Sequence, residues 1–144
     1  FCLPDDQGVL AQMTALFNQF RCSIVAIEQV PKTEIHKYGV IAGEPLKDGL
    51  FRIQDMVEKP RPEDAPSDLA IIGRYILTPD IFDILEQTEP GTNGEVQITD
   101  ALLKQAQTGC VLAYQFRGRR FDCGSVDGFV QATQHCYENY YLKQ

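Results

Sequence analysis

The chain has 144 residues, of which 44% are hydrophobic, and its 13 basic and 20 acidic side chains give a formal net charge of -7 at pH 7. This length suits one globular domain. The acidic balance argues against a nucleic-acid partner. No run approaches the roughly 20 apolar residues that cross a membrane. Five cysteines without a C-x-x-C pair and only two histidines argue against zinc or a disulfide framework, and favour free thiols in a cytoplasmic protein.

The first elements predict an α/β arrangement. The chain begins FCLPDD, without Met and inside what reads as a strand, so we expect a piece of a longer protein. Residues 9–20 place apolar side chains at i, i+3, i+4 and i+7, which predicts a helix with one apolar face. Residues 22–30, CSIVAIEQV, are short, β-branched and apolar, which predicts a buried strand and hence an α/β layer.

Three more strands are expected in the middle of the chain. YGVIA and LFRIQDMVEK, separated by the turn-forming GEPLKDG, predict two paired strands over 38–42 and 50–59. LAIIGRYIL, over 69–77, predicts a central strand. Its internal Gly73 indicates a bulge or a place where a ligand approaches the backbone.

The second half alternates helices with one strand. Residues 78–88 and 98–108 predict two helices, with Thr78 and Thr99 as their capping residues. CVLAYQFRG predicts a strand over 110–118. A last helix should open near Ser125 with an apolar face. The expected order is β, α, β, two β strands, β, α, α, β, α.

Two acidic positions are candidate metal ligands. Asp5 and Asp6 follow an expected strand end, where α/β sheets bind ligands and where a carboxylate can hold Mg²⁺. Asp122 stands before the Cys-Gly turn and the last helix, and could share one metal with Asp5. Turn formation and helix initiation are the simpler local interpretations of these residues.

The segment VEKP offers an acid and a base side by side. Glu58 and Lys59 point in opposite directions if the strand continues, so Glu58 could accept hydrogen bonds from sugar hydroxyls while Lys59 meets a phosphate. Pro60 should hold Lys59 in an extended conformation. Considered alone, the pair is more simply a solvated strand end.

Other polar residues carry weaker signals. Gly39 lacks the Cβ that would keep a ligand from the backbone. The arginines over 117–120 are most simply a solvated strand end, although they could meet a phosphate. No Ser, His and acid arrangement is visible, so nucleophilic catalysis is unsupported.

Six blocks taken together resemble one family, the bacterial UTP:glucose-1-phosphate uridylyltransferases. The blocks are LPDD, HKYGVI, VEKP, APSDLAIIGRYILTPDIF, GEVQITDAL and FDCGSVDGF, and they keep the family's order and spacing over nearly the whole chain. The resemblance implies a Rossmann-like α/β fold with a mixed, mainly parallel sheet flanked by helices. It also implies in-line attack of glucose 1-phosphate on the α-phosphate of UTP, with Mg²⁺ as cofactor and UDP-glucose and pyrophosphate as products.

The resemblance also implies roles for individual residues. Asp5 matches the metal-binding, catalytic aspartate and Asp122 the second metal position, whereas Asp6 matches less closely. The remaining matches concern substrate: Glu58 for sugar hydroxyls, Lys59 for phosphate binding and catalysis, Gly39 for a backbone contact to the sugar, and Gly73 for the pocket wall. Thr99 and Asp100 recur in the family, but capping explains them.

One departure from the family shapes the expected function. The family's glycine-rich, phosphate-cradling segment is not among these residues, so residues 1–144 are interpreted as the sugar-binding, metal-contributing C-terminal part of the enzyme, inactive alone. Because open sheet edges and the family's own assembly invite pairing, we expect a homo-oligomer. A thymidylyltransferase or other sugar-nucleotide pyrophosphorylase, and a non-catalytic binding or interaction domain, remain alternatives.

Overall fold

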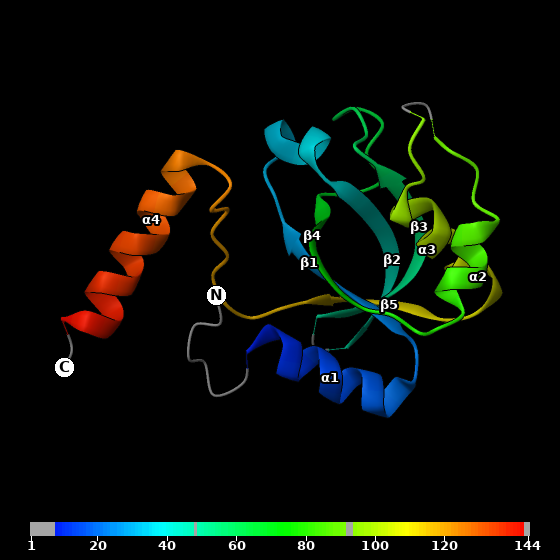
Figure 1. Ribbon diagram of the computed structural model, residues 1–144, viewed down its shortest axis with the longest axis horizontal. Helices are drawn as coiled ribbons and strands as arrows, with labels where there is room; N and C mark the ends of the chain where they lie inside the picture. Colours follow the sequence, from blue (N-terminus) through cyan, green and yellow to red (C-terminus); the bar gives the residue numbers. More distant parts are fainter. Residues whose placement is uncertain (1–7, 48, 92–93, 143–144) are drawn as a thin grey trace.

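Five strands wrap into a ring, and helices lie around it (Figure 1). The computed structural model describes residues 8–47, 49–91 and 94–142. The expected first strand and the candidate metal ligand Asp5 lie outside these residues. The strands are β1 (Ser23–Gln29), β2 (Gly39–Lys47), β3 (Leu50–Glu58), β4 (Leu69–Ile76) and β5 (Val111–Gln115).

The sheet is mixed and mainly antiparallel. The strands pair in the order β1-β4-β2-β3-β5, and β5 returns to β1. Among the described strands only the β1–β5 pair is parallel, so the expected mainly parallel sheet is wrong for this part of the chain. The reason is local: β2, β3 and β4 follow one another without a crossover α-helix between them, and such strands pair antiparallel. The fold is still broadly α/β.

The closed ring removes one reason for expecting an oligomer. Each described strand has a neighbour on both sides, so the open sheet edges that were expected to recruit a second copy are not formed by these strands. The homo-oligomer stays a prediction without that support.

Helices surround the ring and extend from it. They are α1 (Val9–Phe20), α2 (Ile81–Glu86), α3 (Ile98–Thr108) and α4 (Val126–Cys136), with a 3-10 turn at Lys32–Lys37 and a π turn at Tyr137–Tyr141. No helix in the described residues is long and apolar enough to cross a membrane. The helix and strand order agrees with the sequence prediction wherever the structure describes it.

Strand β1 is buried on both faces, which explains its continuous apolar run. Ile24 and Ala26 pack with Met13 of α1, whereas Val25 and Ile27 belong to the cluster that includes α3. Successive side chains of a strand point to opposite faces, so one strand contributes to two clusters. Each large apolar side chain buried in this way contributes about 1.5–3 kcal/mol.

Two expected helix caps are wrong, whereas the expected start of the last helix near Ser125 is confirmed. Thr78 does not cap α2, because its hydroxyl accepts a hydrogen bond from Gln105 (2.9 Å) and pairs with Ser23 (3.0 Å). Thr99 lies inside the first turn of α3, which follows Gln97. Ser125 does cap α4, accepting a hydrogen bond from the Gly128 backbone N–H at 3.1 Å.

The turn between the two paired strands is shorter than expected. β2 continues to Lys47, so Gly43 and Pro45 of the expected GEPLKDG turn lie within the strand, opposite Ile53 and Phe51 of β3. A register irregularity beside each of them accommodates the two residues in the ladder.

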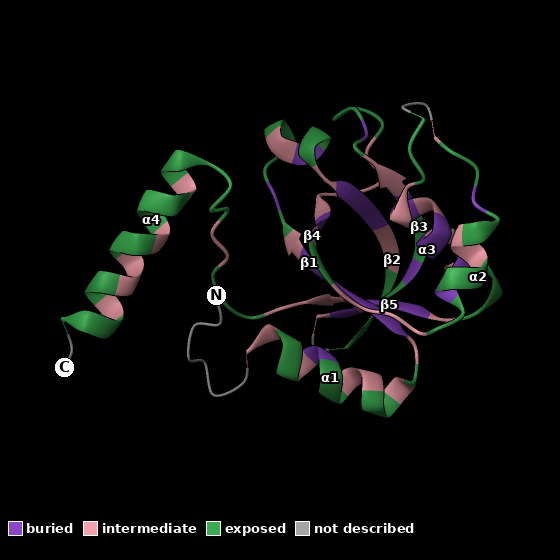
Figure 2. Cartoon of the chain, viewed as in Figure 1, coloured by how far each residue is buried: buried purple, intermediate pink, exposed green. Residues whose placement is uncertain are grey.

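Helix α4 extends away from the ring with its apolar face uncovered (Figure 2). None of its residues is buried, and Val126, Phe129 and Val130 are 80%, 61% and 55% exposed. The expected apolar face therefore exists, but the described residues do not bury it.

Candidate functional site

A pocket of about 260 Å³ opens where β2, β3 and β4 meet the start of α3. The antiparallel register of β2 and β3 places Gly39 directly opposite Glu58. The candidate residues Gly39, Glu58 and Gly73 therefore line one cavity although the sequence separates them. Four other residues also line the pocket. The sequence did not single out Tyr38 and Tyr75, gave Thr99 a capping role, and included Arg120 only among the arginines that could meet a phosphate.

Gly39 provides room for its neighbours. A Cβ at this position would lie 2.8 Å from Thr99 Cγ2 and 3.0 Å from Glu58 Oε2. A larger residue would displace both side chains. From the sequence, Gly39 is expected to admit a ligand to the backbone. In the structure its missing Cβ also lets the Thr99 and Glu58 side chains pack close to the strand.

Gly73 has the opposite surroundings. Its φ is +71°, in the region that glycine adopts readily, and a Cβ there would meet no heavy atom within 4 Å. A larger side chain at Gly73 would therefore meet backbone strain and no steric block. Its place on the pocket wall follows from the β-bulge conformation that the sequence indicated.

Glu58 and Lys59 turn toward each other, which corrects the sequence expectation. β3 ends at Glu58, and Lys59 has φ +46°, so the chain does not stay extended before Pro60. The Lys59 N–H donates to the Tyr38 carbonyl oxygen (2.9 Å), a bond that holds the chain in this turn. As a result, Lys59 Nζ lies 3.7 Å from Glu58 Oε1 instead of on the other face.

Burial differs between these two charged groups. The Glu58 side chain is 25% exposed and that of Lys59 is 58% exposed. Glu58 therefore reaches into the pocket, while Lys59 stands near it with most of its side chain in solvent. The Lys59 ammonium group, although paired with Glu58, is exposed enough to meet an anion near the pocket as well.

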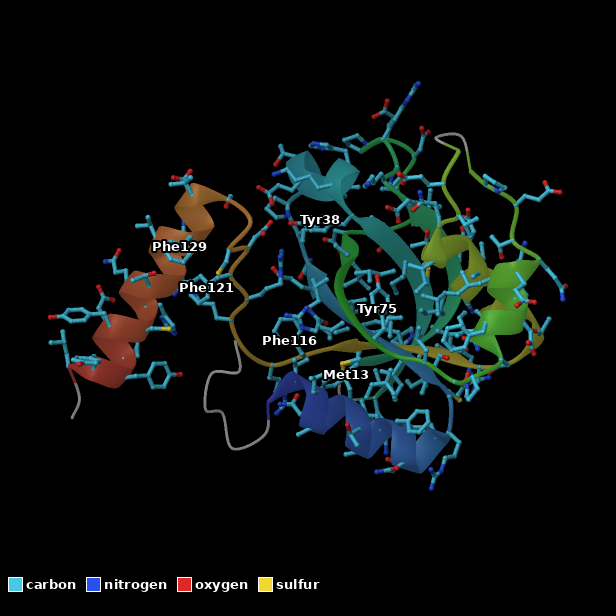
Figure 3. The ribbon with its side chains drawn as sticks, viewed as in Figure 1. Met13, Tyr38, Tyr75, Phe116, Phe121 and Phe129 are labelled. Atoms are coloured by element: carbon cyan, nitrogen blue, oxygen red, sulfur yellow. The ribbon has the colours of Figure 1, made fainter. Side chains whose placement is uncertain are left out.

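Aromatic side chains complete the wall. Tyr75 lies on β4 and Tyr38 lies just before β2, and both line the pocket (Figure 3). Burial, and secondarily the negative charge of Glu58, raise the pKa of Tyr75, so its hydroxyl keeps its proton. Strand alternation could have found Tyr75, which stands two residues after Gly73 on the same strand.

Thr99 is the least expected member of the pocket. It is 3% exposed, and its hydroxyl oxygen makes no hydrogen bond to the described residues. Local sequence favoured a capping role because Thr is common at helix starts. Its position in the wall depends on how α3 packs against β2, which local sequence does not contain.

Arg120 lies beside the pocket and is held from two sides. Its Nε donates to Glu28 Oε2 at 2.9 Å, and Nη2 donates to the Tyr38 hydroxyl at 3.1 Å. Its guanidinium carbon is 5.5 Å from the centre of the Tyr38 ring. Burial lowers the pKa of Arg120, but the bonds to Tyr38 and Glu28 outweigh it and raise the pKa overall, so the group stays charged.

Asp122 stands outside this pocket, before α4. Its Oδ1 accepts a hydrogen bond from the Gly124 N–H at 3.0 Å, and its carbonyl oxygen accepts one from the Ser125 hydroxyl at 3.1 Å. These contacts match the helix-initiating role. The second carboxylate oxygen has the chemistry that Mg²⁺ prefers, but residues 8–47, 49–91 and 94–142 contain no cluster of three or more possible metal ligands.

Comparisons with known proteins point in one direction. A family model described as nucleotidyl transferase matches residues 2–139. A UTP--glucose-1-phosphate uridylyltransferase of Pseudomonas aeruginosa is 69% identical over 95% of this chain, which spans 49% of that protein. The chain thus spans about half the length of the curated relatives it matches.

Solved structures agree with the sequence match. A UDP-glucose pyrophosphorylase complexed with UDP-glucose superposes with a TM-score of 0.88 at 57% identity, covering 99% of this chain and 53% of that one. A UTP-bound UGPase from Acinetobacter baumannii gives a TM-score of 0.76 at 33% identity, covering 91% and 45%. The nucleotidyl transferase family generally uses a divalent metal ion. This chain belongs to the nucleotidyl transferase family.

Proposed function

We propose that this chain forms the sugar-phosphate-binding part of a UTP:glucose-1-phosphate uridylyltransferase. The observation that carries the proposal is the pocket in which Gly39 and Glu58 face each other across the β2–β3 ladder with Lys59 beside them. The 69% identity to a uridylyltransferase favours this activity over that of a thymidylyltransferase.

The pocket provides the groups that a sugar phosphate requires. The Glu58 carboxylate accepts hydrogen bonds from the glucose hydroxyls. Gly39 lines the same pocket, and its missing Cβ leaves room for the Glu58 and Thr99 side chains. The Lys59 ammonium neutralises the phosphate on the anomeric carbon. Gly73 and Tyr75 of β4 line the same pocket.

The reaction needs position and charge more than covalent chemistry. An oxygen of the glucose 1-phosphate phosphate forms a bond to the α-phosphorus of UTP, while the bond from that phosphorus to the bridging oxygen breaks and pyrophosphate leaves. Holding the sugar phosphate in line with the nucleotide removes much of the entropic barrier. Lys59 acts here by fixing and neutralising the attacking group.

For the metal we propose Mg²⁺, held by Asp122 together with Asp5. Carboxylate oxygens are hard ligands that suit this ion, which also binds phosphate oxygens of substrates. The ion supplies neutralisation of negative charge when bound. Asp122 is exposed, and within the described residues its carboxylate accepts one hydrogen bond, from the Gly124 N–H, so an oxygen remains for a ligand.

Ligand binding tests the proposal directly. We expect the 144-residue chain to bind glucose 1-phosphate and UDP-glucose in a calorimetric or NMR titration. Because a hydrogen bond to a charged group is worth about 1.5–3 kcal/mol, Glu58→Gln should weaken both affinities about 10- to 100-fold. Lys59→Ala should weaken binding of glucose 1-phosphate and leave binding of free glucose unchanged.

Matched controls separate this site from general charge effects. Glu63→Gln and Lys47→Ala change exposed residues away from the pocket and should leave the affinities unchanged. Absence of sugar-phosphate binding by the unaltered chain contradicts the proposal. Synthesis of UDP-glucose by this chain from UTP, glucose 1-phosphate and Mg²⁺ would contradict its expected inactivity alone.

A further inference from the structure

We propose that Arg120 binds the phosphate of the sugar phosphate, with the Tyr38 hydroxyl as a second donor. This inference rests on the proposed function, which assigns that phosphate to Lys59 alone. It starts from a cluster that the proposed function leaves unused: a partly buried arginine, its carboxylate partner Glu28 and a tyrosine at the pocket wall.

The arginine is fixed in place. Its side chain is 23% exposed, and it is held by a 2.9 Å ion pair to Glu28 of β1 and a 3.1 Å bond to the Tyr38 hydroxyl. A guanidinium carries five N–H donors, and these contacts use two of them. Within the described part of the chain the Nη1 group has no hydrogen-bond partner, so it can donate to a ligand at the pocket that Arg120 lines.

The tyrosine extends the same donor set. The Tyr38 oxygen accepts the Arg120 N–H, and an oxygen that accepts in this way keeps its own proton available for donation. The Tyr38 main-chain oxygen also accepts from the Lys59 N–H at 2.9 Å. One residue therefore connects the Arg120 guanidinium and the Lys59 backbone, and sets both beside the same cavity.

The chemistry favours a phosphate as ligand. A planar guanidinium offers two parallel donors that match two oxygens of one phosphate group, and it stays charged at any physiological pH. The contacts with Glu28 and Tyr38 occupy Nε and one N–H of Nη2, so Nη1 and the second N–H of Nη2 are the donors that remain for a phosphate. A neutral sugar hydroxyl would gain less than an anion from a guanidinium that is held in place by Glu28 and Tyr38.

A purely structural role for Arg120 is the competing explanation, because the ion pair also ties β1 to the segment before α4. The two roles differ in ligand selectivity. We expect Arg120→Gln to weaken binding of glucose 1-phosphate about 10- to 100-fold while binding of free glucose is unchanged. Arg120→Lys should recover part of the loss because it keeps the charge but not the fork.

Two further variants complete the experiment. Arg119→Gln removes a neighbouring exposed arginine that lies over Phe121 and should leave both affinities unchanged. Tyr38→Phe removes only the second donor, and a smaller loss confined to glucose 1-phosphate is expected. Thermal melting of every variant reports whether the fold is intact.

The outcomes separate this inference from the proposed function. If the unaltered chain binds glucose 1-phosphate and Arg120→Gln binds it equally well, or loses glucose and glucose 1-phosphate to the same extent, Arg120 does not bind the phosphate. If the unaltered chain binds neither ligand, the proposed function itself is wrong.

Discussion

Helices α1 and α4 each have an apolar face, but they differ in whether the described residues bury it. In α1 that face packs against the ring, and Met13 is fully buried with Ile24 and Leu112. In α4 no residue is buried, and Phe129 is 61% exposed (Figure 2). Amphipathic spacing in a sequence therefore indicates that a face needs covering, but it does not identify what covers it.

This difference has an energetic consequence. An isolated helix of this length is marginal in water, and tertiary packing supplies most of the stability of a protein helix. The described contacts between α4 and the segment before it are local, such as Phe121 with His135 at 5.2 Å. We therefore expect α4 to open at a lower free energy than α1.

The largest expected effect comes from truncating one apolar side chain in each helix. Met13→Ala removes a fully buried side chain and should lower the free energy of unfolding by about 2–5 kcal/mol. Phe129→Ala should change it by less than about 0.5 kcal/mol because most of that ring is in solvent. Urea denaturation measures both.

Equal losses of unfolding free energy in Met13→Ala and Phe129→Ala would contradict the difference between α1 and α4. They would show that the α4 face is covered in solution, and light scattering would then reveal whether a second copy covers it. The predicted homo-oligomer is tested by the same measurement.

A smaller effect distinguishes two glycines of the pocket. Gly39→Ala places a methyl group 2.8 Å from Thr99 Cγ2, and overpacking of this kind costs about 1–3 kcal/mol. It should also weaken UDP-glucose binding because it displaces Glu58. Gly73→Ala meets no neighbour, so only its strained backbone contributes, and we expect about 1 kcal/mol.

Thermal unfolding and calorimetric titration of the two variants make this test. Preserved binding in Gly39→Ala would contradict this prediction. It would show that Thr99 and Glu58 can move to make room for the methyl group.

A local effect is expected at the start of α4. Ser125→Ala removes the hydroxyl that caps the Gly128 N–H, which should cost the helix about 1 kcal/mol. Amide exchange followed by mass spectrometry should show faster exchange in α4 and no change in α1. Ser125→Asp retains a capping oxygen and should behave like the unaltered chain. Faster exchange in both helices would mean that they unfold as one unit.

The last prediction concerns the reactivity of two cysteines, and its effect on stability is the smallest. Burial, and secondarily the neighbouring Cys110 thiol, raise the pKa of Cys22 to about 12, whereas Cys123 is exposed beside α4. The thiolate is the reactive form, so at pH 8 iodoacetamide should modify Cys123 first and leave Cys22 unmodified. Peptide mass spectrometry measures the order, and urea-unfolded protein is the control in which Cys22 reacts too.

The same pKa shift makes the free energy of unfolding depend on pH. Cys22 keeps its proton in the folded chain at a pH where the unfolded chain has lost it, so its contribution is complete below pH 9 and declines as the pH rises toward 12. Early modification of Cys22 at pH 8 would contradict the burial of this thiol.

Local patterns predicted the elements well because their causes are local. The spacing in residues 9–20 predicted α1, and the predicted start of α4 near Ser125 was confirmed. The direction of strand pairing could not be predicted in the same way, since it depends on which strands become neighbours. The ladder that sets Gly39 opposite Glu58 was expected as a pairing, but its register was not.

The site shows the same limit more sharply. Gly39, Glu58 and Gly73 carried signals in their own segments, and they line one pocket. Lys59 was placed on the wrong side because its bond to the Tyr38 carbonyl overrides the usual preference before proline. Arg120 had only a weak signal, since Glu28, its partner, is remote in the chain.

The pairing of β1 with β5 also determines how the chain reaches its fold. Ser23 lies beside Val111, so the ring closes only after most of the chain has been made and brought together. Contacts so far apart in sequence have a high loop-closure entropy and are associated with slow folding. During synthesis the apolar strand β1 is made long before its partner β5. Until β5 pairs with it, one edge of β1 is open to pairing with other chains, which favours aggregation.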